Sequence, residues 1–312
     1  MNYLATLITI WSISSIAALS LNIIVGYAGQ LFVAQGVLMG VGAYTYARLT
    51  TGPGWSPWLC ILLAIAFAAV TGLLFAVGSL RLRNYDYVLF TLIGQLVLTQ
   101  VALGWTQVTG GATGITNIPR PSLGGTPLDD PRKFGAVCLV AVGVSGVLLW
   151  LAVRRLGLRL RSFRASERSA AALGQNVEWT RLTVGAIAGA GAGLAGALNA
   201  SFVNFVQPSD YSIAMSILLV IYVMVGGAGS LLGTTVGVAL IMAIPEIINH
   251  FNQVEITLRG PLAQMIYGAV IIAVVLFRPN GLVPERPLLR AGRFRGPEGA
   301  DSLVVASAGG TS

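Results

Sequence analysis

Long apolar runs alternate with short polar breaks along almost the whole chain. Runs of spanning or near-spanning length occupy residues 3–25, 30–49, 57–80, 86–105, 134–153, 181–203, 213–228, 231–248 and 262–277. A helix needs about 20 mostly apolar residues to cross the hydrocarbon core of a bilayer. The pattern therefore predicts an all-α polytopic membrane protein with about nine transmembrane helices, or eight to ten if glycine-broken runs are re-entrant.

Composition and charge agree with this class and fix an orientation. The 312 residues are 55% hydrophobic and 10% charged, and all but one of the 19 basic residues are Arg. Arg81 and Arg83 follow the third run, residues 154–176 follow the fifth, and further Arg residues follow Phe277. The positive-inside rule places these segments in the cytoplasm, with the N-terminus outside and the C-terminus inside. The basic residues do not interleave with aromatic ones, so nucleic-acid binding is not expected.

The segment 154–176 is the longest charged interruption, with six Arg and one Glu. Each Arg costs roughly 2.5 to 3.5 kcal/mol at a bilayer centre, so the segment lies outside the hydrocarbon. Ser166 fits an N-cap before Glu167, and Gly174 fits a left-handed residue after the helix end. A helix of about two turns is marginal alone in water. We interpret it as a docking helix, with an amphipathic linker on lipid headgroups as the alternative.

An internal repeat appears at an offset of 200 residues, where VGYAGQL (25–31) matches VGGAGSL (225–231). Its glycines, among them Gly26, Gly29, Gly226 and Gly229, weaken helices and let backbones approach closely. Paired glycine-broken segments in two halves of a membrane protein indicate a solute path lined by discontinuous helices. Close helix packing is the alternative. GAIAGAGAGLAGAL (185–198) is a stronger packing candidate, because its small residues have no polar neighbours.

Few polar residues lie inside the apolar runs, and each is expected to face protein or water rather than lipid. They are Asn22, Gln30, Gln35, Thr91, Gln95, Gln100, Asn199 and Glu246. Glu246 is the only acid at apparent membrane depth, where it fits either a substrate ammonium group or a helix-end carboxylate in contact with water.

The remaining segments suggest no covalent chemistry. The loop 103–121 is rich in Gly, Thr and Pro and reads as an ordered lid or docking loop. Residues 284–312 cannot build a core and are expected to form a disordered cytoplasmic tail after a membrane domain of residues 1–283. No phosphate-binding Gly-x-x-x-x-Gly-Lys-Ser/Thr loop occurs, and no cluster of His, Cys or acids has metal-ligand spacing.

The chain resembles the M-type permease subunit of LIV-type (branched-chain amino acid) ABC importers. The resemblance runs from about residue 20 to residue 283. It rests on the segments LNIIVGYAGQ (21–30), VGAYTYA (41–47), LRLRNYDYVLFTL (80–92), TGGATGITNIPRP (109–121), RSFRASERSAAALGQN (161–176), VGGAGSLLGTTVGVAL (225–240) and FRPNGL (277–282).

The resemblance implies a role for the charged segment, whereas the candidate path residues come from the repeat and from the polar residues in apolar runs. The segment 161–176 corresponds to the cytoplasmic coupling helix, here about 166–174, that sits in a cleft of the ATPase. Its implied coupling residues are Arg164, Glu167, Ala170, Ala171 and Gly174. Ala165, Ser166 and Ser169 depart from the residues usual in the family. The candidate residues of the translocation path are Asn22, Gly26, Gly29, Gln30, Gln35, Gln95, Gly226, Gly229 and Glu246.

The implied setting is the bacterial cytoplasmic (inner) membrane. The implied partners are a second permease, like or unlike this chain, two ATPase subunits and an external solute-binding protein, besides membrane lipid. ATP and Mg²⁺ would bind the ATPases, so no cofactor and no metal is expected in this chain.

Branched-chain amino acids are the favoured solute, with urea, short amides or other small acids as alternatives. A passive channel for a small polar solute remains a competitor, although it would need no docking helix. A membrane subunit of an enzyme complex would normally carry more intramembrane ionisable residues than Glu246.

Overall fold

The computed structural model describes residues 2–82, 84–123, 126–127, 130–165, 174–250, 265, 268 and 282–283. Its longer helices are α1 (Asn2–Asn22), α2 (Gln35–Thr51), α3 (Pro57–Ser79), α4 (Asn84–Gly104), α6 (Pro131–Ala165), α8 (Val177–Val203), α9 (Ile213–Gly226) and α10 (Leu231–His250). Between them lie the π-helical turn η1 (Ile23–Tyr27), the short helix α5 (Thr106–Thr109) and the 3₁₀ turns η2 (Gly111–Thr113) and η3 (Pro208–Tyr211).

Four two-residue strands are the only exception to the expected all-α fold in the described part of the chain. The strands are β1 (Ile115–Thr116), β2 (Ser122–Leu123), β3 (Thr126–Pro127) and β4 (Phe205–Val206). β1 pairs with β4 and β2 pairs with β3, both antiparallel. The β1–β4 pair ties the loop after α5 to the segment that follows α8, so the predicted ordered loop is confirmed.

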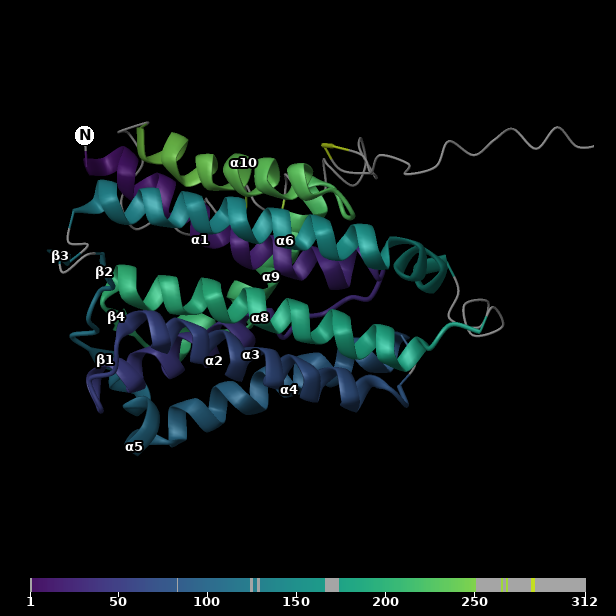
Figure 1. Cartoon of the computed structure of the whole chain (residues 1–312), viewed down its shortest axis with the longest axis horizontal. Coiled ribbons are helices and arrows are strands. Elements are labelled where there is room, and N and C mark those ends of the chain that lie inside the picture. The colour runs from purple at the N-terminus through teal and green to yellow at the C-terminus, as the bar shows by residue number, and fades with distance from the viewer. Residues whose placement is uncertain are drawn as a thin grey trace, which may run out of the picture.

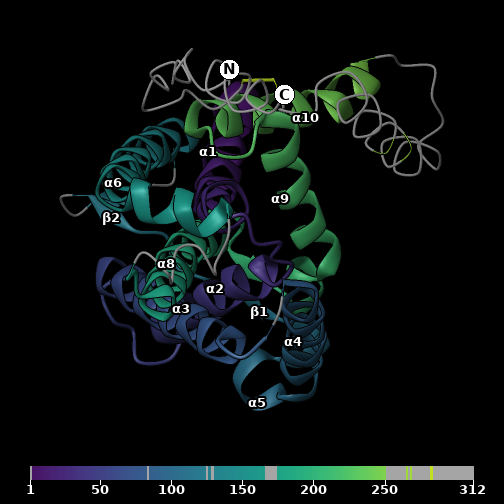
Figure 2. The ribbon, with the colours of Figure 1, turned by 90° about the vertical axis from the view of Figure 1, so that its right-hand side faces the viewer.

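Most helices run between two ends of one bundle (Figure 1). One end carries the N-terminus, α5 and the four strands, and we call it the loop end. The opposite end carries the last turns of α6 and the start of α8, and we call it the arginine end because Arg154, Arg155, Arg159 and Arg164 lie there. In the view from the arginine end, α9 runs across the bundle from α10 toward α4 (Figure 2).

The described part of the chain has five helical segments long and apolar enough to cross a membrane. They are Tyr3–Tyr27, Pro57–Ser79, Tyr85–Gly104, Pro131–Gly157 and Val177–Val203. The pair α9 and α10, bent by 118° at its break, adds a sixth if it counts as one span. The expected nine helices are therefore not confirmed. The run 30–49 gives only the 17-residue helix α2, and the run 262–277 lies almost wholly outside the described residues.

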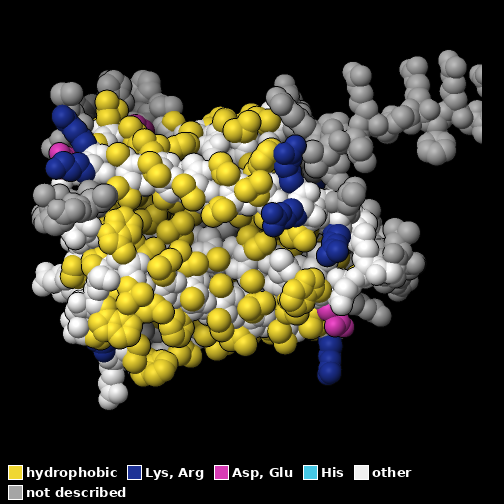
Figure 3. All heavy atoms as spheres, viewed as in Figure 1, with side chains coloured by type: hydrophobic (Ala, Val, Ile, Leu, Met, Phe, Trp, Pro, Cys, Tyr) yellow, Lys and Arg dark blue, Asp and Glu magenta, His cyan; other side chains and the backbone are white. Residues whose placement is uncertain are grey.

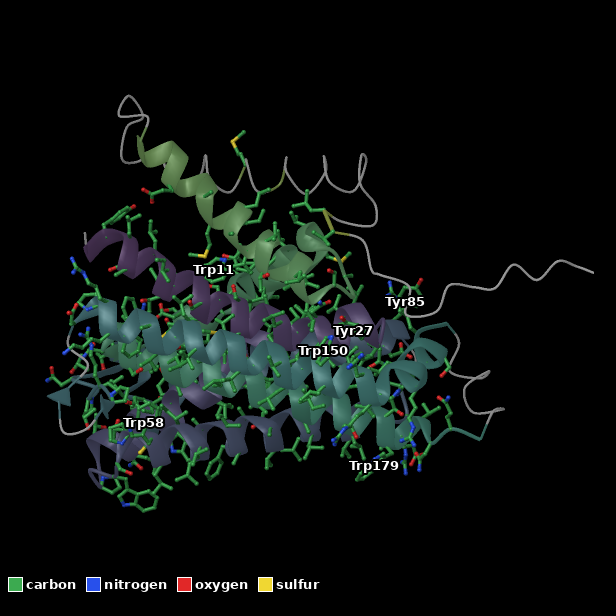
Figure 4. The ribbon with its side chains drawn as sticks, turned by 45° about the horizontal axis from the view of Figure 1, so that its top comes forward. Trp11, Tyr27, Trp58, Tyr85, Trp150 and Trp179 are labelled. Atoms are coloured by element: carbon green, nitrogen blue, oxygen red, sulfur yellow. The ribbon has the colours of Figure 1, made fainter. Side chains whose placement is uncertain are left out.

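The surface has the layout of a membrane protein. Hydrophobic side chains cover the middle of the face in Figure 3, and Lys and Arg appear toward its two ends. Exposed aromatic residues also mark the ends, with Trp58 at the loop end and Tyr85 and Trp179 at the arginine end (Figure 4). Amphipathic rings are typical of membrane–water interfaces. The bundle axis thus lies along the membrane normal.

Helix α6 extends further into the charged segment than the apolar pattern predicted. The apolar run was expected to end at residue 153, but the helix continues for 12 more residues to Ala165. Leu156 is partly buried, and Leu160 and Phe163 are buried. Their spacing of four and three residues keeps one face on the bundle. Arg154, Arg155 and Arg159 are exposed, so the charged segment begins as the amphipathic end of a long helix.

The small-residue stripe of α8 packs against α2 and α3, as its composition predicted. A methyl group placed on Gly196 would overlap the carbonyl oxygen of Met39 in α2, and one on Gly189 would overlap that of Ala68 in α3. Gly185 and Gly193 are equally close to α3. Close backbone approach of this kind supplies the packing that holds helices together in lipid.

Candidate functional site

The first repeat copy interrupts the path of α1. After the π-helical turn η1, residues 28–34 are not helical, and Gly29 has a left-handed φ of 71°. The predicted run 30–49 therefore becomes helical only at Gln35. Phe32 is buried, with its ring centroid 5.9 Å from Phe75 and 6.2 Å from Tyr87. Non-helical backbone at membrane depth is tolerated where protein covers it. Ala28, Phe32 and Ala34 are covered in this way, whereas Leu31 is exposed.

The second repeat copy forms the sharp break between α9 and α10. Helix α9 ends at Gly226, and Gly227 and Gly229 have φ values of 122° and 88°. Such values suit glycine and disfavour residues with a side chain. Both copies of the repeat thus break helices, as the glycines predicted.

The two breaks touch each other through Asn22. The side-chain oxygen of Asn22 accepts a hydrogen bond from the backbone N–H of Gly229 at 2.9 Å. Its amide nitrogen donates to the carbonyl of Ser230 at 3.2 Å and to the hydroxyl of Thr234 at 2.8 Å. A methyl group on Gly26 would overlap both Asn22 and the Gly229 nitrogen. Close packing therefore accounts for Gly26, the left-handed φ accounts for Gly229, and the place of both in the path stays a prediction.

The end of α9 is also held by the segment after the last apolar run. Leu282 and Val283 donate backbone hydrogen bonds of 3.1 Å to the carbonyls of Val225 and Gly226. A methyl group on Gly226 would overlap the carbonyl oxygen of Gly233 in α10. Three segments distant in sequence, around residues 22–26, 225–230 and 282–283, therefore meet at one place.

Gln95 closes a buried polar cluster where α2 and α9 begin. Its side-chain oxygen accepts from the backbone N–H of Val37 at 3.0 Å and from the Ser216 hydroxyl at 3.2 Å. The same hydroxyl accepts from the N–H of Gly36 at 2.8 Å, and the Gln95 amide donates to the Tyr211 carbonyl at 2.7 Å. The first N–H groups of a helix have no partner within it. Side chains of α4 and α9 supply the partners here because α2 starts inside the protein.

The sequence did not single out Ser216. Serine is common in membrane helices, and nothing in its local sequence marks it as a partner of α2. Only the arrangement of α2, α4 and α9 brings its hydroxyl to the start of α2.

The other two glutamines predicted for the path are also buried, whereas Gln100, predicted only to face protein or water, is exposed in α4. Gln35 is fully buried and donates to the Ser20 hydroxyl at 2.9 Å and to the Ala17 carbonyl at 3.4 Å, both in α1. Gln30 is 8% exposed within the first break. These residues face protein rather than lipid, as expected of polar groups at this depth. Their contact with solute stays a prediction.

Glu246 lies apart from the breaks. It is partly buried in α10 and lines a cavity of about 270 Å³ with Leu7 and Trp11 of α1. It stands 15 residues beyond Leu231, which is about 22 Å along the helix axis. The structure therefore does not bring Glu246 together with Asn22 and Gly229.

Two of the five predicted coupling residues are described, and one touches the first break. A methyl group on Gly29 would lie 2.7 Å from the Arg164 side chain near the end of α6. Gly174 has the left-handed φ predicted for it, 74°. The Ser162 hydroxyl donates to the Gln175 side chain at 2.8 Å, which holds the two flanks of the segment together. Glu167, Ala170, Ala171 and the predicted helix 166–174 lie outside the described residues, Gly174 excepted.

The described residues offer no group of three His, Cys, Asp or Glu side chains that could hold a metal ion. Cys60 and Cys138 are buried free thiols. The arrangement is built from buried amides, hydroxyls and backbone breaks, which suit conformational change more than covalent chemistry.

Comparisons with known proteins agree on one family. A family described as "Branched-chain amino acid transport system / permease component" matches residues 3–275. The high-affinity branched-chain amino acid transport system permease protein LivM of Escherichia coli K12 is 29% identical over 308 residues, covering 90% of this chain and 70% of the relative. LivM of Salmonella typhimurium is 29% identical over 318 residues, covering 93% and 73%.

A more distant relative is the probable LivM permease protein of Methanocaldococcus jannaschii, 26% identical over 245 residues, covering 74% of this chain and 69% of the relative. No solved structure matches the chain significantly.

Proposed function

The chain belongs to the family of permease components of branched-chain amino acid transport systems, and from that premise we propose how it carries its solute and couples to ATP. It is a LivM-type membrane permease subunit of an ABC importer, not an enzyme. As in this family generally, a partner permease, ATPases and a solute-binding protein complete the transporter. The proposed solutes are branched-chain amino acids, which the names of the relatives favour over urea, short amides or small acids.

The loop end faces outward and the arginine end faces the cytoplasm of a bacterial inner membrane. Support comes from the Arg residues at the end of α6, together with Arg81 beyond α3. The positive-inside rule places both in the cytoplasm. The run 262–277 is then a ninth membrane segment that brings the tail, residues 284–312, to the cytoplasmic side.

The proposed mechanism rests on the contact between the two helix breaks. Helix α2 starts and helix α9 ends inside the protein, and the breaks at these two places meet at Asn22 and Gly229. Discontinuous helices allow a path to open and close by small rigid movements of half-helices. The buried breaks and the Gln95 cluster are the elements that would move.

The coupling segment acts on this region through α6. The last turns of α6 lead into residues 166–174, which dock on an ATPase, and Arg164 already lies against Gly29. A displacement of the segment when the ATPases close would therefore reach the first break directly. A passive channel would need no such connection, which disfavours that competitor.

The test is reconstitution of the complete transporter in proteoliposomes. The chain is combined with its partner permease, ATPases and binding protein, and uptake of radiolabelled L-leucine is measured with ATP inside. We expect uptake that requires both ATP and the binding protein. Uptake without ATP would favour the channel, and ATP-dependent uptake of urea or a short amide but not leucine would overturn the solute assignment.

A further inference from the structure

A cavity of about 500 Å³ opens at the loop end between α2 and α4 and reaches inward to Val37 near the start of α2. Val37, Tyr44 and Arg48 of α2 line it on one side, and Leu98 of α4 and Trp105, which joins α4 to α5, line it on the other. Tyr211 closes it where η3 meets α9. α2, α4 and α5 lie together at this corner of the bundle (Figure 1).

Resting on the proposed function, we propose that this cavity is the entry site where the permease first holds the branched-chain amino acid released by the binding protein. The volume falls within the range of about 300–1,000 Å³ that is usual for small-molecule sites. Apart from a few polar groups, the wall is aliphatic or aromatic, which suits a branched aliphatic side chain.

The Tyr44 hydroxyl is the most informative polar group of the wall. It is buried and has no hydrogen-bond partner among the described residues. A buried hydroxyl without a partner is unfavourable, and native proteins rarely keep one without a reason. The hydroxyl oxygen is covered in this conformation, so the carboxylate or ammonium group of a bound amino acid would bond to it only after the Tyr44 ring turns toward the cavity.

Charges of both signs flank the cavity, as an amino acid zwitterion requires. Arg48 lines the mouth, is exposed, and donates to the carbonyl of Gln107 in the overlying loop. Asp210 does not line the cavity itself; it is exposed in η3 between the lining residues Pro208 and Tyr211, and its carboxylate accepts a hydrogen bond from the Gln207 side chain at 2.8 Å. A lipid acyl chain would need neither charge.

The inner wall of the cavity adjoins the Gln95 cluster. Val37 and Tyr211 both line the cavity, and both bond to Gln95 through their backbones. A solute in the inner part of the cavity therefore contacts the start of α2 and Tyr211, which ends η3 just before α9. Movement of α2 or α9 would change the size of the site, which links binding to the proposed opening of the path.

The first test fills the cavity in the complete transporter. Thr45 lines it, and its hydroxyl bonds to the carbonyl four residues earlier in α2. Thr71 of α3 makes the same kind of bond but does not line the cavity. We expect Thr45→Phe to abolish leucine uptake per assembled complex, whereas Thr71→Phe keeps it.

The second test removes a single oxygen atom. If Tyr44 only packs, Tyr44→Phe deletes an unsatisfied group and leaves uptake and thermal stability equal or higher. If Tyr44 binds the solute, leucine uptake at saturating binding protein falls about 2- to 10-fold, the effect of one net hydrogen bond. Asp210→Asn is expected to lower uptake as well, while the ATPase activity stimulated by the loaded binding protein persists in both variants.

The outcomes separate the entry site from the proposed function. A wild-type transporter that does not take up leucine overturns the function itself. A leucine-transporting wild type with unchanged uptake per complex in Thr45→Phe and Tyr44→Phe overturns only the entry site. Displacement by Thr45→Phe of a photoactivatable lipid chain or of a cross-link to the partner permease, with uptake retained, would assign the cavity to that occupant instead.

Discussion

Asn22 joins positions that lie 207 to 212 residues away in the sequence, because one side chain bonds to Gly229, Ser230 and Thr234. It is fully buried. An amide has two donor hydrogens and an acceptor oxygen, and all three are used here. The residue therefore fixes the distance between the two breaks, whatever its contact with solute.

Asn22→Ala is expected to lower the free energy of unfolding by about 1–3 kcal/mol, because the buried N–H of Gly229 loses its acceptor. Thr234→Val, which removes one of the three partners, should have a smaller effect. Thr235→Val is the control, since its hydroxyl donates to Leu232 within the same helix. Thermal unfolding of the purified complex gives the measurement, and equal stability of all three variants would refute the role of Asn22.

At the scale of elements, α6 runs as one continuous helix from the membrane bundle to Ala165, where the proposed coupling segment begins. Its last turns keep Leu160 and Phe163 on the bundle and bring Arg164 against the first break. Gly174, the last residue of the predicted segment 166–174, has a φ of 74°, and no atom of the described residues lies within 4 Å of a methyl group placed on it. Substitution there strains the backbone without creating a clash.

Gly174→Val should reduce leucine uptake per ATP hydrolysed, because a β-branched residue at this φ costs roughly 1–2 kcal/mol and displaces the docking segment. Assembly of the complex should survive. Gly146→Val is the matched control, since Gly146 also has open space but an ordinary helical φ within α6. Unaltered uptake and coupling in Gly174→Val would count against the docking role.

At the scale of the whole molecule, the two ends of the bundle differ in chemistry. Ordered loops and short strands form one end, and Arg154, Arg155 and Arg159 are exposed toward the other. Both native cysteines are buried. Introduced cysteines at exposed positions therefore report which end faces the periplasm.

In intact cells, Thr113→Cys at the loop end should react with a membrane-impermeant thiol reagent. Glu178→Cys, at the exposed start of α8, should react only after the membrane is opened if the arginine end is cytoplasmic, as the positive-inside rule predicts. The unsubstituted protein serves as the background. The opposite labelling pattern would reverse the assigned orientation.

The sequence by itself determined the membrane class, the positions of most helices, the two breaks and the packing stripe of α8. These features follow from local composition, since apolar length, glycine and charge act within one segment. The left-handed Gly174 was predictable for the same reason. The family resemblance, confirmed over residues 3–275, likewise needed only short motifs.

Only the tertiary structure decided what the predicted residues touch. Gln95 serves the start of α2, Asn22 ties the two breaks together, and Glu246 stands apart, although all three looked alike as buried polar residues in apolar runs. The hydrophobic pattern of the sequence also gave no indication of the role of Ser216 or of the cavity beside Tyr44. Each contact joins helices distant in the chain, and a hydrogen bond depends on where their backbones pass rather than on local periodicity.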